Sequence, residues 1–219
     1  MNHFRRVLVS LLLGIFLTPQ APAQQDERPD ALVRRLSGEV LAAVKSTPEI
    51  QRGNPRHILD LVTEKILPHV DFERMTALAA GRHWKQATPA QQQRLTEEFR
   101  DLLVYVYSGA LAQVRDDKVI VKPMRSNARD GLAEIYTQVV QPRGREPIEL
   151  NYRLVREPSG WKIYDMSIMG AWLVQSYRSS FSREIRMEGV EGLIQMLAER
   201  NDRLASEMAS GDAAPASGN

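Results

Sequence analysis

The stretch Trp161–Phe181, WKIYDMSIMGAWLVQSYRSSF, changes its hydrophobic period in the middle. Its first half is rich in β-branched, aromatic and other apolar residues, which is typical of a strand. After Gly170 the residues Leu173, Tyr177 and Phe181 recur every fourth position, which is the spacing of one face of a helix. A strand therefore leads directly into a helix, and this favours an α+β fold.

Three more segments with the character of strands precede this one, separated by turn signals rich in Gly, Pro and Asp. Tight connections of this kind join antiparallel neighbours. We therefore expect a curled antiparallel sheet of four strands, within 118–124, 131–141, 146–157 and 160–169. Apolar and polar residues alternate strictly in the third strand, which predicts that one face of the sheet is buried.

Helical patterns stand on both sides of the sheet in the sequence. The longest expected helix begins with Thr88 as its N-cap and Pro89 in its first turn, and it continues to Val114 as one amphipathic element. Shorter helices are expected over 31–44, 54–68 and 71–81, and after the sheet over 173–188 and 190–204 with Gly189 as the break. The sequence thus predicts N-terminal and C-terminal helices packed around an apolar cavity over the sheet.

Residues 1–23 have the layout of a secretory signal peptide. Arg5 and Arg6 precede an apolar run that is too short to cross a bilayer, for which about 20 residues are needed, and small residues follow at 21–23. We expect one domain over 24–208 and a disordered small-residue tail over 209–219. An exported protein follows from this interpretation.

Charge and cysteine content exclude several classes of protein. The 29 Lys and Arg residues exceed the 27 Asp and Glu residues by two, and Arg5 and Arg6 account for the difference. The remainder of the chain has no excess of basic residues, so we expect no nucleic-acid partner. Because the chain has no cysteine, it can have neither a disulfide framework nor a cysteine nucleophile nor a lipoprotein anchor.

Motifs that carry catalysis or bind cofactors are absent from the sequence: there is no HExxH, GxSxG, GxGxxG or GxxxxGK[ST]. His69, Asp71, Glu73 and His83 lie close in sequence, but polar residues at the start of a helix explain them better than a metal site does. Asp165 is the one candidate catalytic group, because a carboxylate on an apolar strand can act as a general base. We favour the other interpretation, in which Asp165 is structural and paired with an arginine.

Several motifs of the sequence resemble those of the MlaC family of periplasmic phospholipid-binding proteins, also called toluene-tolerance auxiliary components. The order of these motifs agrees with the order of the elements above. They are PHVDF at 68–72, Trp84 followed by Thr88-Pro89, WKIYDM at 161–166, Gly170, Tyr177-Arg178 with Phe181, and the final Gly189…Gly192-Leu193. The likeness covers about 32–204. The chain departs from the family at Ala171-Trp172, where the family tends to have a small β-branched residue and Ser.

The resemblance implies a periplasmic carrier without enzymatic activity or cofactor. Such a carrier holds the acyl chains of a phospholipid in a hydrophobic pocket and shuttles the lipid between outer-membrane and inner-membrane complexes, which maintains the lipid asymmetry of the outer membrane. The partners that it implies are an inner-membrane ABC transporter with a lipid-binding ring protein, and an outer-membrane lipoprotein associated with a porin. We expect a monomer. The alternative is a small exported isomerase or hydrolase-like enzyme of cone-shaped fold that uses Asp165.

Under this reading, the lipid pocket is framed by apolar residues of the long helix, the sheet and the helix after it. The expected lipid-binding residues are Leu102, Tyr105, Val106, Ile135, Val139, Ile148, Leu150, Tyr152, Met166, Ile168, Leu173 and Tyr177. The assignment of sheet faces depends on register, because an error of one residue inverts a face. Arg82, Arg143 and Arg145 are further candidates for contacts with a phosphate or a partner.

Overall fold

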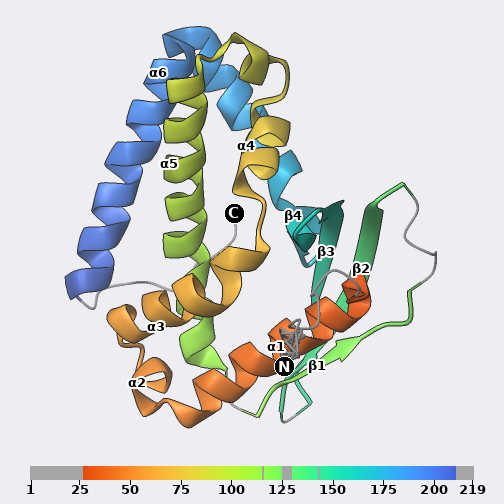
Figure 1. Cartoon of the computed structure of the whole chain (residues 1–219). Coiled ribbons are helices and arrows are strands. Elements are labelled where there is room, and N and C mark those ends of the chain that lie inside the picture. The colour runs from red at the N-terminus through yellow and green to blue at the C-terminus, as the bar shows by residue number, and fades with distance from the viewer. Residues whose placement is uncertain (1–26, 115, 125–129, 143, 211–219) are drawn as a thin grey trace, which may run out of the picture.

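The computed structural model of the chain describes residues 27–114, 116–124, 130–142 and 144–210 (Figure 1). The expected signal peptide, Arg143 and residues 211–219 of the expected tail lie outside these ranges. One group of helices precedes the sheet in sequence and one long helix follows it. The helices are α1 (Pro29–Ser46), α2 (Pro48–Gln51), α3 (Pro55–Leu61), α4 (Phe72–Ala80), α5 (Pro89–Ser108) and α6 (Leu173–Ser210).

The sheet is an antiparallel meander in the order β1-β2-β3-β4-β5. It has five strands and not the four expected. After β4 the backbone turns through Met169 (φ 50°) and Gly170 (φ 86°), and two positive φ values in succession are what a tight hairpin turn needs. The chain therefore pairs back on β4 for two residues. The strands are β1 (Lys118–Val121), β2 (Leu132–Val140), β3 (Ile148–Glu157), β4 (Gly160–Ile168) and β5 (Ala171–Trp172).

Side-chain caps set the start of three helices, as the sequence predicts. The Asn54 side chain accepts from the His57 N–H before α3, and that of Asp71 accepts from the Arg74 N–H before α4. Thr88 and Gln91 form a capping box at the start of α5. The expected helix over 54–68 is not regular: after α3 it continues as a π-helix, Val62–Ile66, and a 3-10 turn, Leu67–His69.

Pro68 explains this irregularity. A proline inside a helix has no N–H to donate, and its ring crowds the carbonyl four residues earlier. The chain widens before it, and the Leu67 N–H bonds the Val62 carbonyl five residues back. The long helix expected to reach Val114 likewise ends its α-helical part at Ser108 and continues as a 3-10 segment, Gly109–Gln113.

Gly189 divides α6 into two helices. Its backbone (φ 73°, ψ −178°) is a conformation that L side chains rarely adopt, and the direction of the helix changes there. Figure 1 shows the second half running back alongside α5. Helical structure continues through Ser210, so residues 209 and 210 of the expected tail are helical.

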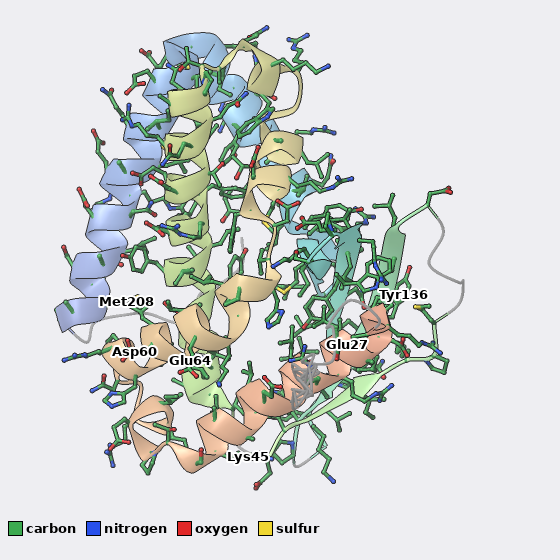
Figure 2. The ribbon with its side chains drawn as sticks, viewed as in Figure 1. Glu27, Lys45, Asp60, Glu64, Tyr136 and Met208 are labelled. Carbon is green, nitrogen blue, oxygen red and sulfur yellow. The ribbon has the colours of Figure 1, made fainter. Side chains whose placement is uncertain are left out.

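Packed side chains form three separate apolar clusters. The first joins α4, α5 and α6 around Phe99 and Phe181, and the second joins α1 to the sheet around Ile135 and Leu154. The third holds the end of α1 against α2 and α3. Val70, in the connection between α3 and α4, packs against both of the first two clusters. In Figure 2, Tyr136 on β2 and Met208 near the end of α6 mark the sheet side and the helical side of the molecule.

Candidate functional site

The strand register brings the predicted sheet residues onto one face. Directly paired residues of antiparallel strands point to the same side. Ile135 pairs with Tyr152 and Tyr152 with Met166, while Leu150 pairs with Ile168. Val139 pairs with Ile148, two residues from Leu150 on the same strand. We call this side of the sheet the inner face; its predicted members are Ile135, Val139, Ile148, Leu150, Tyr152, Met166 and Ile168.

Helices cover only part of the inner face. Leu32, Val33 and Leu36 of α1 pack on it in the cluster that contains Ile135 and Leu154, and Met166 packs against the α4–α5–α6 cluster. The long helix α5 makes its main contacts with α4 and α6 and not with the strands. Within the described residues, four inner-face side chains remain half-buried and outside every packed cluster: Val139, Ile148, Leu150 and Ile168.

Tyr152 occupies the middle of the inner face. Burial raises the pKa of its phenol to about 12, and a hydrogen bond with the Thr137 side chain opposes this rise. Yet the side chain is only half-buried and keeps some accessible surface. A residue that is surrounded by protein and still accessible is what we expect at the wall of an internal hollow. Thr137, which faces the same side, is fully buried and was not singled out from the sequence.

The predicted helical residues lie mainly in the α4–α5–α6 cluster. Leu102 and Leu173 are buried there, with 0% and 5% of their surface exposed, and Val106 and Tyr177 pack against them. The Tyr177 ring meets that of Phe99 edge-on, with 4.9 Å between the centroids. Tyr105 is half-buried, and burial raises the pKa of its phenol, with the charges of Asp101 and Asp202 adding to the rise.

The predicted lipid-binding residues differ in how deeply they are buried. The half-buried residues of the inner face and Val106 have surface that a ligand can touch. Leu102, Ile135 and Leu173 are buried in the packed clusters. Among the predicted arginines, Arg82 and Arg145 are exposed and Arg143 lies outside the described residues.

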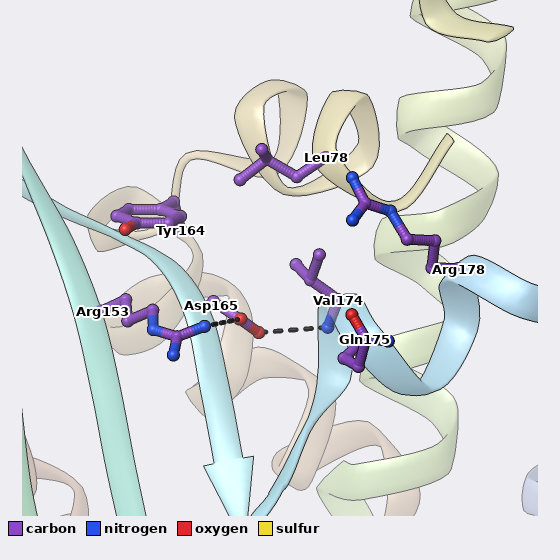
Figure 3. Close-up of a pocket in the computed structure, with 7 residues that line it drawn as sticks. All are labelled: Leu78, Arg153, Tyr164, Asp165, Val174, Gln175 and Arg178. Atoms are coloured by element: carbon purple, nitrogen blue, oxygen red, sulfur yellow. Dashed lines mark hydrogen bonds and ion pairs between the residues drawn. The ribbon is translucent and has the colours of Figure 1, made fainter. Parts of the chain in front are cut away.

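Asp165 lies on the opposite side of the sheet, where its carboxylate connects β4 to the start of α6. Its Oδ1 accepts from the backbone N–H of Met166 (2.9 Å) and of Val174 (3.1 Å), and Arg153 Nη1 lies 3.3 Å from Oδ2 (Figure 3). Burial raises the pKa of Asp165, and these three bonds oppose the rise. Both carboxylate oxygens are therefore engaged, which supports the structural interpretation with an arginine partner.

Trp172 completes this connection. The Arg153 guanidinium carbon lies 3.7 Å from the centre of the Trp172 ring, and Arg153 Nε lies 3.2 Å from Glu134 Oε2. The position at which the chain departs from the MlaC pattern therefore holds the arginine that pairs with Asp165. The sequence alone did not indicate this role, because the contact joins β3 to a two-residue strand that the pattern does not predict.

Two further properties concern the described part of the chain as a whole. Within it, no group of three His, Asp or Glu side chains is arranged to hold a metal ion, including the histidines and acids near position 71. Among the same residues, none of the helices combines the length and apolar character required to cross a bilayer.

The fold and the inner face define a class: an α+β protein in which helices partly cover one apolar face of a curled antiparallel sheet. The chain belongs to the MlaC protein family, whose model matches residues 34–199. The phospholipid-binding protein from Ralstonia solanacearum, solved in complex with a phospholipid, has a similar structure. Its TM-score is 0.76 at 42% sequence identity, over 82% of this chain and 99% of that one.

Two characterised relatives align with most of this chain. The intermembrane phospholipid transport system binding protein MlaC of Haemophilus influenzae is 20% identical over 195 residues, which are 88% of this chain and 90% of that protein. The toluene tolerance protein ttg2D of Pseudomonas putida is 24% identical over 186 residues, or 84% of each chain. The resemblance noted in the sequence is confirmed.

Proposed function

We propose that the chain binds a phospholipid with its acyl chains against the inner face of the sheet, and that it carries the lipid through the periplasm. The observation that supports this most directly is the half-buried apolar set Val139, Ile148, Leu150 and Ile168, which lies outside the packed clusters of the described residues. The relative from Ralstonia solanacearum binds a phospholipid in a fold of the same kind. Its sequence identity of 42% extends over nearly all of that chain.

Elementary energetics explains why such a carrier needs an apolar hollow and no catalytic group. Two acyl chains contain roughly 30 methylenes, and each contributes about 0.8 kcal/mol on leaving water, so free lipid in water costs on the order of 20 kcal/mol. Transfer from a bilayer into an apolar hollow exchanges one apolar medium for another. The headgroup can remain hydrated at the opening, so the site requires no deeply buried charge.

The carrier must also exchange lipid with membrane complexes. A binding protein alone shifts no equilibrium, so direction has to come from different affinities at the two ends of the route. We propose the partners that the family implies: an inner-membrane ABC transporter with its lipid-binding ring protein, and an outer-membrane lipoprotein–porin complex. We also propose that the protein is exported with cleavage after residue 23 and that it acts as a monomer.

Native mass spectrometry of the purified protein, followed by solvent extraction, tests the binding step. The proposal predicts stoichiometric phospholipid on the protein as isolated from Gram-negative cells. A protein that carries no lipid, and that takes up none from vesicles of phosphatidylethanolamine and phosphatidylglycerol, would contradict it.

A further inference from the structure

A small pocket of about 280 Å³ lies on the side of the sheet opposite to the inner face (Figure 3). Arg153 and Asp165 line it, and they alternate along their strands with the inner-face residues Tyr152 and Met166. The remaining walls come from α4 and α6. They include Leu78, Val174 and Arg178. The sheet therefore separates this pocket from a lipid bound on the inner face, and we call it the outer pocket.

Some of the charged side chains of the outer pocket are paired with one another, and one is not. Arg153 is paired with Asp165 and Glu134, and both oxygens of Asp165 are engaged. Among the described residues, no carboxylate lies within ion-pair distance of Arg178. The pocket thus contains one matched pair of charges and one guanidinium that is open to a ligand.

Arg178 is exposed on α6 and lies beside the end of α4. Its guanidinium rests against Gly81, which follows the last turn of α4, and a Cβ at that glycine would lie 3.6 Å from Arg178 Nε. The carbonyls at the C-terminal end of a helix carry partial negative charge, which favours a cation there. The planar fork of an arginine is pre-organised, so it loses less conformational freedom per hydrogen bond formed than a lysine does.

The shape and chemistry of the outer pocket select the ligand. Leu78 and Val174 form apolar walls beside Arg178, and Gln175 adds a side-chain amide. An arginine fork matches a planar carboxylate with two parallel hydrogen bonds. The buried Asp165 carboxylate repels an anion in proportion to its charge, so it disfavours a doubly charged phosphate more than a singly charged carboxylate. The apolar walls suit the methylenes of a glutamate.

We propose that the outer pocket receives a glutamate or aspartate side chain of a protein partner, with Arg178 as its ion-pair partner. This inference rests on the proposed function, because a carrier has to dock with the complexes that load and unload it. It places one docking contact on the face of the sheet that does not hold lipid. Docking can then occur while the acyl chains remain bound.

Nuclear magnetic resonance of the arginine Nε–Hε groups tests the proposal with small probes. N-acetylglutamate N-methylamide should shift the Arg178 signal saturably, and N-acetylglutamine N-methylamide, which lacks the charge, should not. Arg178→Gln should weaken binding of the glutamate probe, followed through the Arg153 signal, by about tenfold or more. Arg183→Gln is the matched control, because Arg183 is exposed on the same helix and outside the outer pocket.

The outcomes separate the alternatives. A saturable shift with inorganic phosphate and none with the glutamate probe would replace the proposal with a phosphate site. No saturable shift with either probe would overturn it. Lipid content, measured by mass spectrometry on the same samples, should be equal in Arg178→Gln and in the unmodified protein. Failure of the outer pocket is therefore distinguishable from failure of the lipid carrier.

Discussion

The Trp172 ring stacks on the Arg153 guanidinium at 3.7 Å, on the same side of the sheet where Arg153 pairs with Asp165. Because Asp165 also accepts from the Val174 N–H, these three side chains fix the start of α6 to strands β3 and β4. The chain has an aromatic residue here, where the resemblance to the family implies a small polar one. The connection positions the first half of α6, which bounds both the helical core and the outer pocket.

Replacing Trp172 with valine should lower the free energy of unfolding by about 1–2 kcal/mol, because a stacked guanidinium–indole pair contributes about that much when partly desolvated. Urea unfolding measures the change. Trp172→Phe should keep part of the stacking and lose less. If the Arg153→Met and Trp172→Val changes were additive in a double-mutant cycle, the two side chains would not be coupled and the account of this connection would be wrong.

Asp165→Asn should destabilise the fold and leave lipid binding intact. The amide loses the ion pair with Arg153 and keeps one acceptor oxygen, so we expect a loss of about 1–3 kcal/mol in urea unfolding. Asp60→Asn, an exposed position on α3, is the control and should change little. An enzyme that uses Asp165 predicts the opposite pattern: an unchanged stability and a lost activity.

His69 should make stability dependent on pH. Burial lowers its pKa below the ordinary 6.5, and the nearby charges of Arg35 and Lys162 add to the effect, opposed by Glu39 and Glu27. Below pH 6.5 the unfolded chain therefore binds more protons at this residue than the folded chain, so stability falls as the pH falls through this range. Urea unfolding at pH 7.5 and pH 5.5 should show a smaller loss in His69→Gln. Equal losses in both proteins would refute this assignment.

Two matched substitutions, each introducing a carboxylate, test which face of the sheet holds lipid. Leu150 is half-buried on the inner face, whereas Ile120 pairs with Gln138 on the other face and is 51% exposed. A carboxylate pointing at acyl chains costs several kcal/mol, so Leu150→Asp should lose most of its bound phospholipid in native mass spectrometry. Ile120→Asp should retain it. Circular dichroism checks that both variants are folded, and equal lipid content in the two would contradict the proposal.

Local signals in the sequence predicted much of this structure. The caps at Asn54, Asp71 and Thr88 are confirmed because capping depends on residues three positions apart. The alternation in β3 placed Leu150 and Tyr152 on one face, and the register agrees. The turn signals located the hairpins, because glycine permits positive φ and proline fixes φ.

Other features depend on contacts between distant segments and could not be read from local patterns. Strand β5 exists because a two-residue turn folds Ala171 and Trp172 back on β4. Packing also decides which predicted lipid residues become core: Leu102 is buried by α4 and α6, and nothing in its own segment distinguishes it from Val106. The π-helical turn before Pro68 forms because the preceding helix has to accommodate the proline ring.

Photo-crosslinking shows whether the acyl chains lie on the inner face of the sheet. The purified protein would be loaded with a phosphatidylethanolamine that carries a diazirine near the middle of one acyl chain, then irradiated, digested and sequenced by mass spectrometry. The account predicts crosslinks in the peptides of β3 and β4 at inner-face residues, Leu150 and Ile168 foremost, and at Val106 of α5. Crosslinks confined to the other face, at residues such as Ile120 or Tyr136, would contradict it.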